Sequence, residues 1–284
     1  MCPNCRRFSH SSCCWLQQPL RCITWLRNLF TAGSRKRRLL SRPMANNYFQ
    51  FKQFRIEQAA CAMKVSTDAC VLGAVADLSH AKRILDIGTG TGLLALMAAQ
   101  RNPAAQIEAV EIDPAAAAQA AANAAACPWS YRLHIRALSL RAYAATQPGS
   151  FDHILCNPPF FRHSLRSPDD RRTTARHAAE DTLSFGELAG FAAAHLTPAG
   201  RLTVLLPPAE MQEFVRTAHQ AGLYSITQLV LRHRAGSKPL RCITAFGLTP
   251  QPMQQTELTM RAAADDSLYS AEFSALLQPF YLAL

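Results

Sequence analysis

Residues 157–160 (Asn-Pro-Pro-Phe) combine residue types that could hold a planar amino group. The side-chain oxygen of Asn157 and the carbonyl oxygen of Pro158 can both accept hydrogen bonds from one –NH2 group. Two consecutive prolines remove two backbone donors and fix φ, so the segment is stiff and presents its carbonyl oxygens. Phe160 can stack on a base that has been lifted out of its strand. A plain proline turn would explain the prolines but neither Asn157 nor Phe160.

A second segment, residues 86–92 (Asp-Ile-Gly-Thr-Gly-Thr-Gly), has glycines at alternate positions. Glycines let the backbone approach a ligand closely, and a helix that begins near Leu93 would offer unpaired N–H groups. Glu111 stands nineteen residues after Gly92, and a carboxylate at this distance can accept both hydroxyls of a ribose. The alternative is a glycine turn without a ligand, and the spacing to Glu111 favours a nucleoside-containing cofactor.

Alternating apolar strands and helices must position these two segments. The expected strands are residues 83–87, 107–112, 131–138, 151–156, 201–206, 225–232 and 240–248, and the expected helices are 93–101, 115–126, 183–196 and 209–221. Strands that alternate with helices predict an α/β fold in which a mostly parallel, seven-stranded sheet is covered on both faces. Only a short turn separates the last two strands, so we expect an antiparallel hairpin at one edge. Ligands of such sheets bind beyond the carboxyl ends of the strands.

The glycine segment resembles motif I of the class I S-adenosyl-L-methionine-dependent methyltransferases, which have a Rossmann-like fold. The matching residues are Asp86, Gly88, Thr89, Gly90 and Gly92, and Glu111 takes the ribose-binding position. After the third strand these enzymes often carry an Asp that accepts from the cofactor's adenine amino group, and Ser139 stands in the equivalent stretch here. The Asn-Pro-Pro-Phe segment is similar to the motif of methyltransferases that act on planar amino groups, namely adenine N6, guanine N2 and the glutamine amide of release factors.

Over residues 47–284 the sequence resembles one particular family of these enzymes. Residues 51–54 (Phe-Lys-Gln-Phe), 61–68 (Cys-Ala-Met-Lys-Val-Ser-Thr-Asp), 128–129 (Pro-Trp), 269–273 and 280–282, with the two motifs, closely resemble the bacterial valine-tRNA N6-adenosine methyltransferase family. This implies methylation of the adenosine 3′ of the anticodon, adenosine 37. It also implies that Lys64, Thr67 and Asp68 lie near the methionine end of the cofactor. The alternative for this stretch is a helix N-terminus capped by Thr67 or Asp68.

A basic segment follows Phe160 and could contact the RNA backbone. Its five arginines outnumber Asp169 and Asp170, giving a net charge of +3; they are Arg162, Arg166, Arg171, Arg172 and Arg176. A net positive charge beside a base pocket suits phosphates, whereas a solvated loop without a partner is the alternative.

The overall charge of +11 says less about function than its distribution does. Residues 1–43 hold nine of the 30 Lys and Arg and no acid, so residues 44–284 have 21 basic and 19 acidic residues, a net charge of +2. We expect residues 1–43 to be a basic leader outside the methyltransferase domain, either untranslated sequence before Met44, a transit peptide or an RNA-contacting tail. The ten irregularly spaced cysteines indicate reduced thiols and a cytoplasmic protein.

The expected protein is therefore a monomeric enzyme that uses S-adenosyl-L-methionine and tRNA, with neither a metal nor a membrane-spanning segment. Two other enzymes stay open: a guanine-N2 methyltransferase of ribosomal RNA and a release-factor glutamine methyltransferase. A third alternative is an RNA-binding protein that keeps the fold without catalysis. Intact Asn157 and the glycines of residues 88–92 argue against that alternative.

Overall fold

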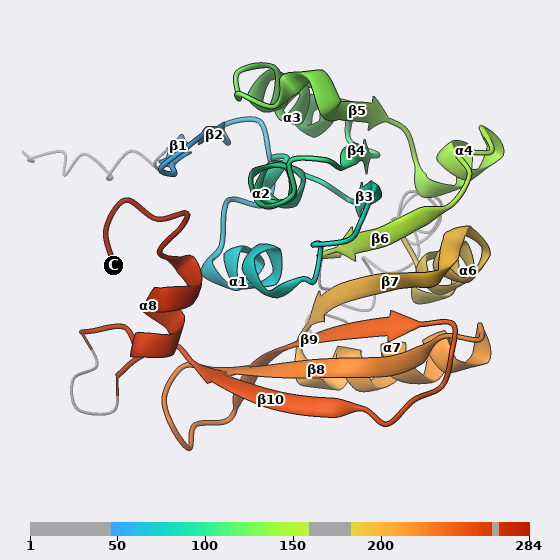
Figure 1. The fold of residues 1–284 in the computed structure, drawn as a ribbon. Coiled ribbons are helices and arrows are strands. Elements are labelled where there is room, and N and C mark those ends of the chain that lie inside the picture. The colour runs from blue at the N-terminus through green and yellow to red at the C-terminus, as the bar shows by residue number, and fades with distance from the viewer. Residues whose placement is uncertain (1–46, 159–182, 263–266) are drawn as a thin grey trace, which may run out of the picture. The chain divides into compact units, whose positions relative to one another are not determined.

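The computed structural model describes residues 47–158, 183–262 and 267–284. Within these ranges the main sheet has eight strands in the order β10–β8–β9–β7–β6–β3–β4–β5 (Figure 1). Their bounds are β3 Arg83–Ile87, β4 Gln106–Glu111, β5 Leu133–Ala137, β6 Phe151–Cys156, β7 Leu196–Leu206, β8 Tyr224–Arg232, β9 Pro239–Gly247 and β10 Gln254–Thr259. A separate antiparallel pair, β1 (Tyr48–Gln50) and β2 (Arg55–Glu57), precedes the sheet in the chain. All seven expected strands are present.

The sheet is mostly parallel, as predicted, because β9 alone among these eight strands runs against its neighbours β7 and β8. The predicted antiparallel hairpin is thus β8–β9, but its expected position at the edge is wrong. The eighth strand, β10, pairs in parallel with β8 and forms the edge. Its sequence, Gln-Gln-Thr-Glu-Leu-Thr, buries only Leu258, so it lacks the apolar alternation that marks a strand.

Helices cover both faces of the sheet, as Figure 1 shows. One face carries α1 (Thr67–Val75), α2 (Leu93–Arg101), α3 (Pro114–Ala125) and α8 (Ala271–Leu277), and the other carries α4 (Leu140–Ala145), α6 (Phe185–His195) and α7 (Pro208–Gln220). Each face has its own cluster of buried apolar side chains. The short helices α4 and α8 were not among the expected ones, whereas the N-terminus of α1 is the helix start that the sequence offered as an alternative for residues 64–68. The third strand begins after a 3-10 turn at Ser130–Arg132. None of the described helices is both long and apolar enough to cross a bilayer.

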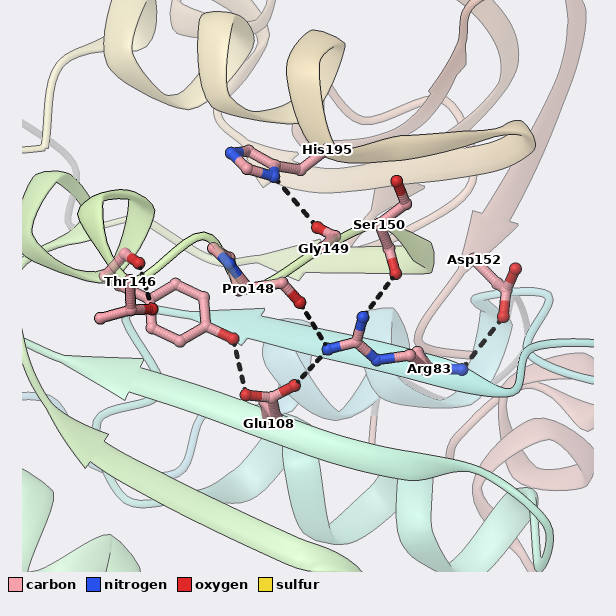
Figure 2. A network of polar contacts seen from close by, with 9 residues as sticks. Arg83, Glu108, Thr146, Pro148, Gly149, Ser150, Asp152 and His195 are labelled. Atoms are coloured by element: carbon pink, nitrogen blue, oxygen red, sulfur yellow. Dashed lines mark hydrogen bonds and ion pairs between the residues drawn. The ribbon is translucent and has the colours of Figure 1, made fainter.

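A polar network near the amino ends of β3, β4 and β6 fixes these strands relative to one another (Figure 2). The Arg83 guanidinium donates to Glu108 Oε1 (2.7 Å) and to the carbonyls of Pro148 (2.8 Å) and Ser150 (3.0 Å). Glu108 Oε2 accepts from the Tyr143 hydroxyl at 2.7 Å. Asp152 Oδ2 accepts from the backbone N–H of Arg83 at 3.0 Å. Because three strands are tied at this end, their carboxyl ends meet in a defined register.

Candidate active site

Three neighbouring strands bring the glycine segment, Glu111 and Asn157 to one edge of the sheet. Ile87, the last residue of β3, pairs with Cys156, the last residue of β6, and with Val110 of β4. Gly88 and Asn157 therefore follow directly after paired strand ends, and neighbouring strands lie about 4.8 Å apart. Glu111 ends β4 on the other side of β3. The structure thus places the glycine segment between the Glu111 carboxylate and Asn157.

The glycine segment leaves open space where side chains would otherwise stand. Gly88 (φ +70°) and Gly90 (φ +55°) adopt left-handed conformations, and a Cβ added at either position would meet no atom within 4 Å. Only glycine adopts these angles without strain. The N–H of Gly90 donates to Glu111 Oε2 at 2.8 Å, so the loop and the carboxylate are held together. This open cradle fits a ligand that approaches the backbone closely at the N-terminus of α2.

Asp86 lies beneath the loop and orders it. Its side chain is fully buried, and Oδ2 accepts from the Thr89 hydroxyl at 2.5 Å and from Ala95 N–H at 3.2 Å. Burial raises the pKa of this carboxyl to about 7, although the two donors oppose the shift. Among the described residues, Oδ1 has no hydrogen-bond partner. A cation bound near the loop would favour the ionised carboxylate.

Glu111 retains the acceptor capacity that the ribose role requires. Its Oε1 accepts from Asp113 N–H at 3.1 Å and its Oε2 from Gly90 N–H, and each carboxylate oxygen can accept a further hydrogen bond. The next side chain, Ile112, is 44% exposed. Such an exposed apolar side chain beside the Glu111 carboxylate suits the face of a planar ring. Ile112 was not among the site residues predicted from the sequence, although an apolar residue at the end of a strand was the available signal.

Asn157 presents an acceptor that nothing described in the protein uses. Its Oδ1 is buried and has no hydrogen-bond partner within the described residues. A buried acceptor without a partner costs about 1–3 kcal/mol, so its retention points to a ligand donor. Pro158 is also buried. Phe160 lies outside the described residues, as do the basic-segment residues Arg162, Arg166, Arg171, Arg172 and Arg176.

Residues 64–66 lead into α1, which begins at Thr67, and the structure corrects the expected N-cap. Ser66, rather than Thr67 or Asp68, is the N-cap, because its hydroxyl accepts from Ala69 N–H. Asp68 pairs with the Arg241 guanidinium at 2.9 Å, and the Thr67 side chain lies beside Tyr281. Thr67 and Asp68 are half-buried and Lys64 is exposed. The structure thus gives Thr67 and Asp68 protein partners, and Lys64 remains exposed beside this helix end.

Ser139 lies at the same edge, two residues after β5 ends, and caps α4. Its hydroxyl oxygen accepts from Ala142 N–H at 3.1 Å, which leaves the O–H free to donate. Toward a ligand, Ser139 therefore differs from the acceptor-only Asp whose place it was expected to take.

Asn123 supports the site and was not predicted from the sequence. It is 3% exposed, and its Nδ2 donates to the carbonyls of Thr91 (2.9 Å) and Glu57 (2.8 Å). Its Oδ1 accepts from the N–H of Glu57 at 2.9 Å. Asn123 therefore joins the glycine segment to β2. A buried amide within the Ala-rich helix α3 was the signal that could have indicated this role.

In residues 47–158, 183–262 and 267–284, no three His, Cys, Asp or Glu side chains come close enough to hold a metal ion.

Comparison with known proteins identifies the family. Residues 65–212 match the methyltransferase small domain family model. A tRNA1(Val) (adenine(37)-N6)-methyltransferase from Phocaeicola vulgatus is 42% identical over 239 residues, which cover 84% of this chain and 99% of that protein. A protein of the same name from Bacteroides fragilis YCH46 is 40% identical over 85% of this chain and 100% of its own length.

A solved structure agrees with the fold. A predicted O-methyltransferase from Agrobacterium tumefaciens superposes with a TM-score of 0.55 at 20% identity, covering 76% of this chain and 99% of that one. At this identity the likeness concerns the fold alone, a mostly parallel sheet between two layers of helices. The family match and the two sequence relatives show that the chain belongs to the family of tRNA1(Val) (adenine(37)-N6)-methyltransferases.

Proposed function

We propose that this enzyme transfers the methyl group of S-adenosyl-L-methionine to N6 of adenosine 37 in a valine tRNA. The name shared by the relatives supports the substrate and the position. The buried Oδ1 of Asn157, which lacks a partner among the described residues, carries the proposal. Asn157 follows β6, and β6 pairs with β3, the strand that precedes the glycine segment. An acceptor at this position can bind an amino group that faces the cofactor.

We propose that residues around the glycine segment bind the cofactor. Bound S-adenosyl-L-methionine supplies an electrophilic methyl group on a sulfonium. Glu111 accepts the ribose hydroxyls, Ile112 packs against the adenine, and Ser139 donates to an adenine ring nitrogen. The backbone at Gly88 and Gly90, where an added Cβ would meet open space, approaches the methionine end, assisted by Lys64. Asp86, Thr89, Thr67 and Asp68 act through the shape of the loop and of the N-terminus of α1, since their side chains bond mainly within the protein.

Asn157 and Pro158 prepare the amine in this proposal. Each accepts one N6 hydrogen, which localises the nitrogen lone pair out of the base plane and aims it across the cradle. Phe160 stacks on the base and holds it in place. The methylated ammonium loses its proton readily, so these residues need not include a general base. Catalysis then consists of alignment and electrostatic preorganisation. The five arginines of residues 162–176 would bind the nearby phosphates.

The decisive experiment identifies the methylated nucleoside. Unmodified bulk tRNA is incubated with S-adenosyl-L-methionine and the protein, digested to nucleosides and analysed by mass spectrometry. We expect N6-methyladenosine, with the strongest signal from purified tRNA1(Val). Methylated guanosine would instead support the guanine-N2 alternative. Methylation of a release factor that survives ribonuclease treatment would support the glutamine alternative.

We also propose that residues 44–284 form the complete catalytic domain and act as a cytoplasmic monomer. The family match, residues 65–212, lies inside this range, and tRNA is available in the cytoplasm. Residues 44–284 should match the full chain in turnover number, and light scattering should give the mass of one chain. A loss of tRNA binding on removal of residues 1–43 would support the RNA-contacting interpretation of the leader.

A further inference from the structure

The buried face of α3 consists of four alanines and one amide, Asn123, which is 3% exposed. A buried amide costs free energy unless its polar atoms are hydrogen-bonded. Here Nδ2 donates to the carbonyls of Thr91 (2.9 Å) and Glu57 (2.8 Å), and Oδ1 accepts from Glu57 N–H (2.9 Å). All three bonds reach backbone groups of other segments. Asn123 therefore links α3 to the glycine segment and to the end of β2.

The bond to Thr91 acts on the centre of the glycine segment. Thr91 lies between Gly90 (φ +55°) and Gly92 (φ +85°), so its carbonyl belongs to a left-handed stretch of backbone. The same helix also contacts this segment one turn earlier, because a Cβ added at Gly92 would lie 3.5 Å from the Cβ of Ala120. Residues three apart share one side of a helix. Helix α3 thus fixes both the position of the glycine segment and the direction of one of its peptide groups.

The bonds to Glu57 hold the start of a loop. Asn123 uses both the N–H and the carbonyl of Glu57, as the peptide group of a neighbouring strand would. The loop that follows, residues 58–66, is closed across its base because Gln58 Oε1 accepts from Val65 N–H at 2.9 Å. Helix α1 begins directly after it. The loop therefore runs from a residue held by Asn123 to the N-terminus of α1.

The helix at the end of this loop points toward the glycine segment. A Cβ added at Gly73 of α1 would lie 2.6 Å from the sulfur of Met97 in α2, so the two helices pack closely there. Three residues later the Ala76 carbonyl accepts from the Arg101 guanidinium, near the end of α2. Earlier residues meet earlier ones and later residues meet later ones, so α1 and α2 run parallel. Both helix N-termini therefore lie at the edge of the sheet where the cofactor would bind.

The loop itself passes beside the proposed ribose site. Burial, together with the negative charges of Glu111 and Asp113, raises the pKa of the Cys61 thiol. Cys61 therefore lies near both carboxylates. Met63, two residues further, is 43% exposed, so the loop also presents apolar surface.

We propose that Asn123 is a positioning residue for the cofactor, because it fixes the glycine segment and residues 58–66 relative to each other. This inference rests on the proposed function, because it assumes that the cofactor lies beside Glu111 and the glycine segment. Asn123 acts through the backbone of Thr91 and Glu57, not by contact with the reacting atoms. A site held in its binding conformation loses less entropy when the cofactor binds.

The test compares two buried amides. Asn123→Asp keeps the size of the side chain and removes the donor that reaches Thr91. The control is Asn102→Asp at the C-terminal end of α2, away from the glycine segment. Asn102 is 4% exposed, its Nδ2 donates to two carbonyls, and its Oδ1 accepts from two backbone N–H groups. Asn123→Ala and Asn102→Ala form a second pair in case an aspartate prevents folding.

The measurements are the dissociation constant of S-adenosylhomocysteine, the KM for S-adenosyl-L-methionine, the turnover number and the urea midpoint. Both substitutions should lower the urea midpoint, because each removes buried hydrogen bonds. Only the Asn123 variants should raise the dissociation constant and the KM, by about tenfold. Their turnover number at saturating cofactor should stay within about twofold of the wild type, because Asn157 is unchanged.

Hydrogen exchange of the wild type gives a second readout that needs no substitution. Residues 57–66 and 88–92 should gain protection together when S-adenosylhomocysteine binds, and residues 57–66 should lose this gain in Asn123→Asp. Unchanged protection of residues 57–66 in the wild type would overturn the inference. Equal dissociation constants in the Asn123 and Asn102 variants would also overturn it, whereas weaker binding by Glu111→Ala would still support the proposed cofactor site. Unchanged binding by Glu111→Ala would overturn both.

Discussion

Substitutions of two glutamates in β4 should have different effects. Replacing Glu108 should lower the stability of the protein, and replacing Glu111 should weaken cofactor binding. Glu111 holds the glycine segment at the carboxyl end of β4, whereas Glu108 holds Arg83 and Tyr143 three residues earlier (Figure 2). Replacing each by alanine removes one carboxylate from β4. The two variants therefore serve as matched controls for each other.

The expected magnitudes follow from the hydrogen bonds that each carboxylate makes. Glu108→Ala removes the acceptor of the buried Tyr143 hydroxyl and the ion-pair partner of the half-buried Arg83 guanidinium, which keeps its two carbonyl acceptors. The free energy of unfolding should fall by about 2–3 kcal/mol. Glu111→Ala removes the acceptor of two backbone N–H groups, those of Gly90 and Asp113. Both lie near solvent, where water can replace the carboxylate, so the cost should be about 1 kcal/mol. The same change removes both proposed ribose contacts, at about 2–4 kcal/mol of binding energy, or about 30-fold to 1,000-fold in the dissociation constant.

Calorimetric titration with S-adenosylhomocysteine and urea denaturation measure the two quantities independently. We expect Glu111→Ala to lose affinity with little change in stability, and Glu108→Ala to lose stability with its affinity preserved. An unchanged dissociation constant in a folded Glu111→Ala protein would refute the ribose role. Equal losses of affinity in both variants would show that binding responds to general loosening of β4 rather than to the Glu111 carboxylate.

Three further changes test the remaining parts of the site. Asn157→Ala should lower the turnover number by about 100-fold to 1,000-fold while S-adenosylhomocysteine binding stays unchanged by calorimetry; wild-type turnover would contradict the target-loop assignment. Gly90→Ala should lower the free energy of unfolding by about 1–2 kcal/mol because alanine resists a φ of +55°, and its methyl group should also weaken cofactor binding. The control is Gly190→Ala within α6, where an added Cβ meets open space and φ is not positive. Urea denaturation should show no loss of stability in this control. Burial lowers the pKa of His153 to about 4, so the unfolded chain binds the proton more readily and stability should fall as pH drops from about 6.5 to about 4. In thermal melts over this pH range, His153→Gln should lose less stability than the wild type. An identical pH profile in both proteins would exclude His153 as the cause.

The sequence by itself determined the fold class and the chemistry of the two main motifs. Apolar runs of strand length alternate with helix formers, so seven strands can be assigned from residue types and their periodicity. The glycines of residues 88–92 and the segment at 157–160 are recognisable because backbone conformation and proline stiffness depend on residue type alone. Glu111 is recognisable by its distance along the chain from Gly92.

Only the tertiary structure decided which residues support these motifs. The strand β10 has a polar sequence and exists because β8 offers it an unpaired edge. Asn123 and Tyr281 meet the site through packing between segments far apart in the chain. Asp68 was expected to cap α1 or to lie near the cofactor, but Arg241, 173 residues away, binds it. Local patterns fix backbone preference and burial, whereas such pairings depend on which elements the folded sheet places side by side.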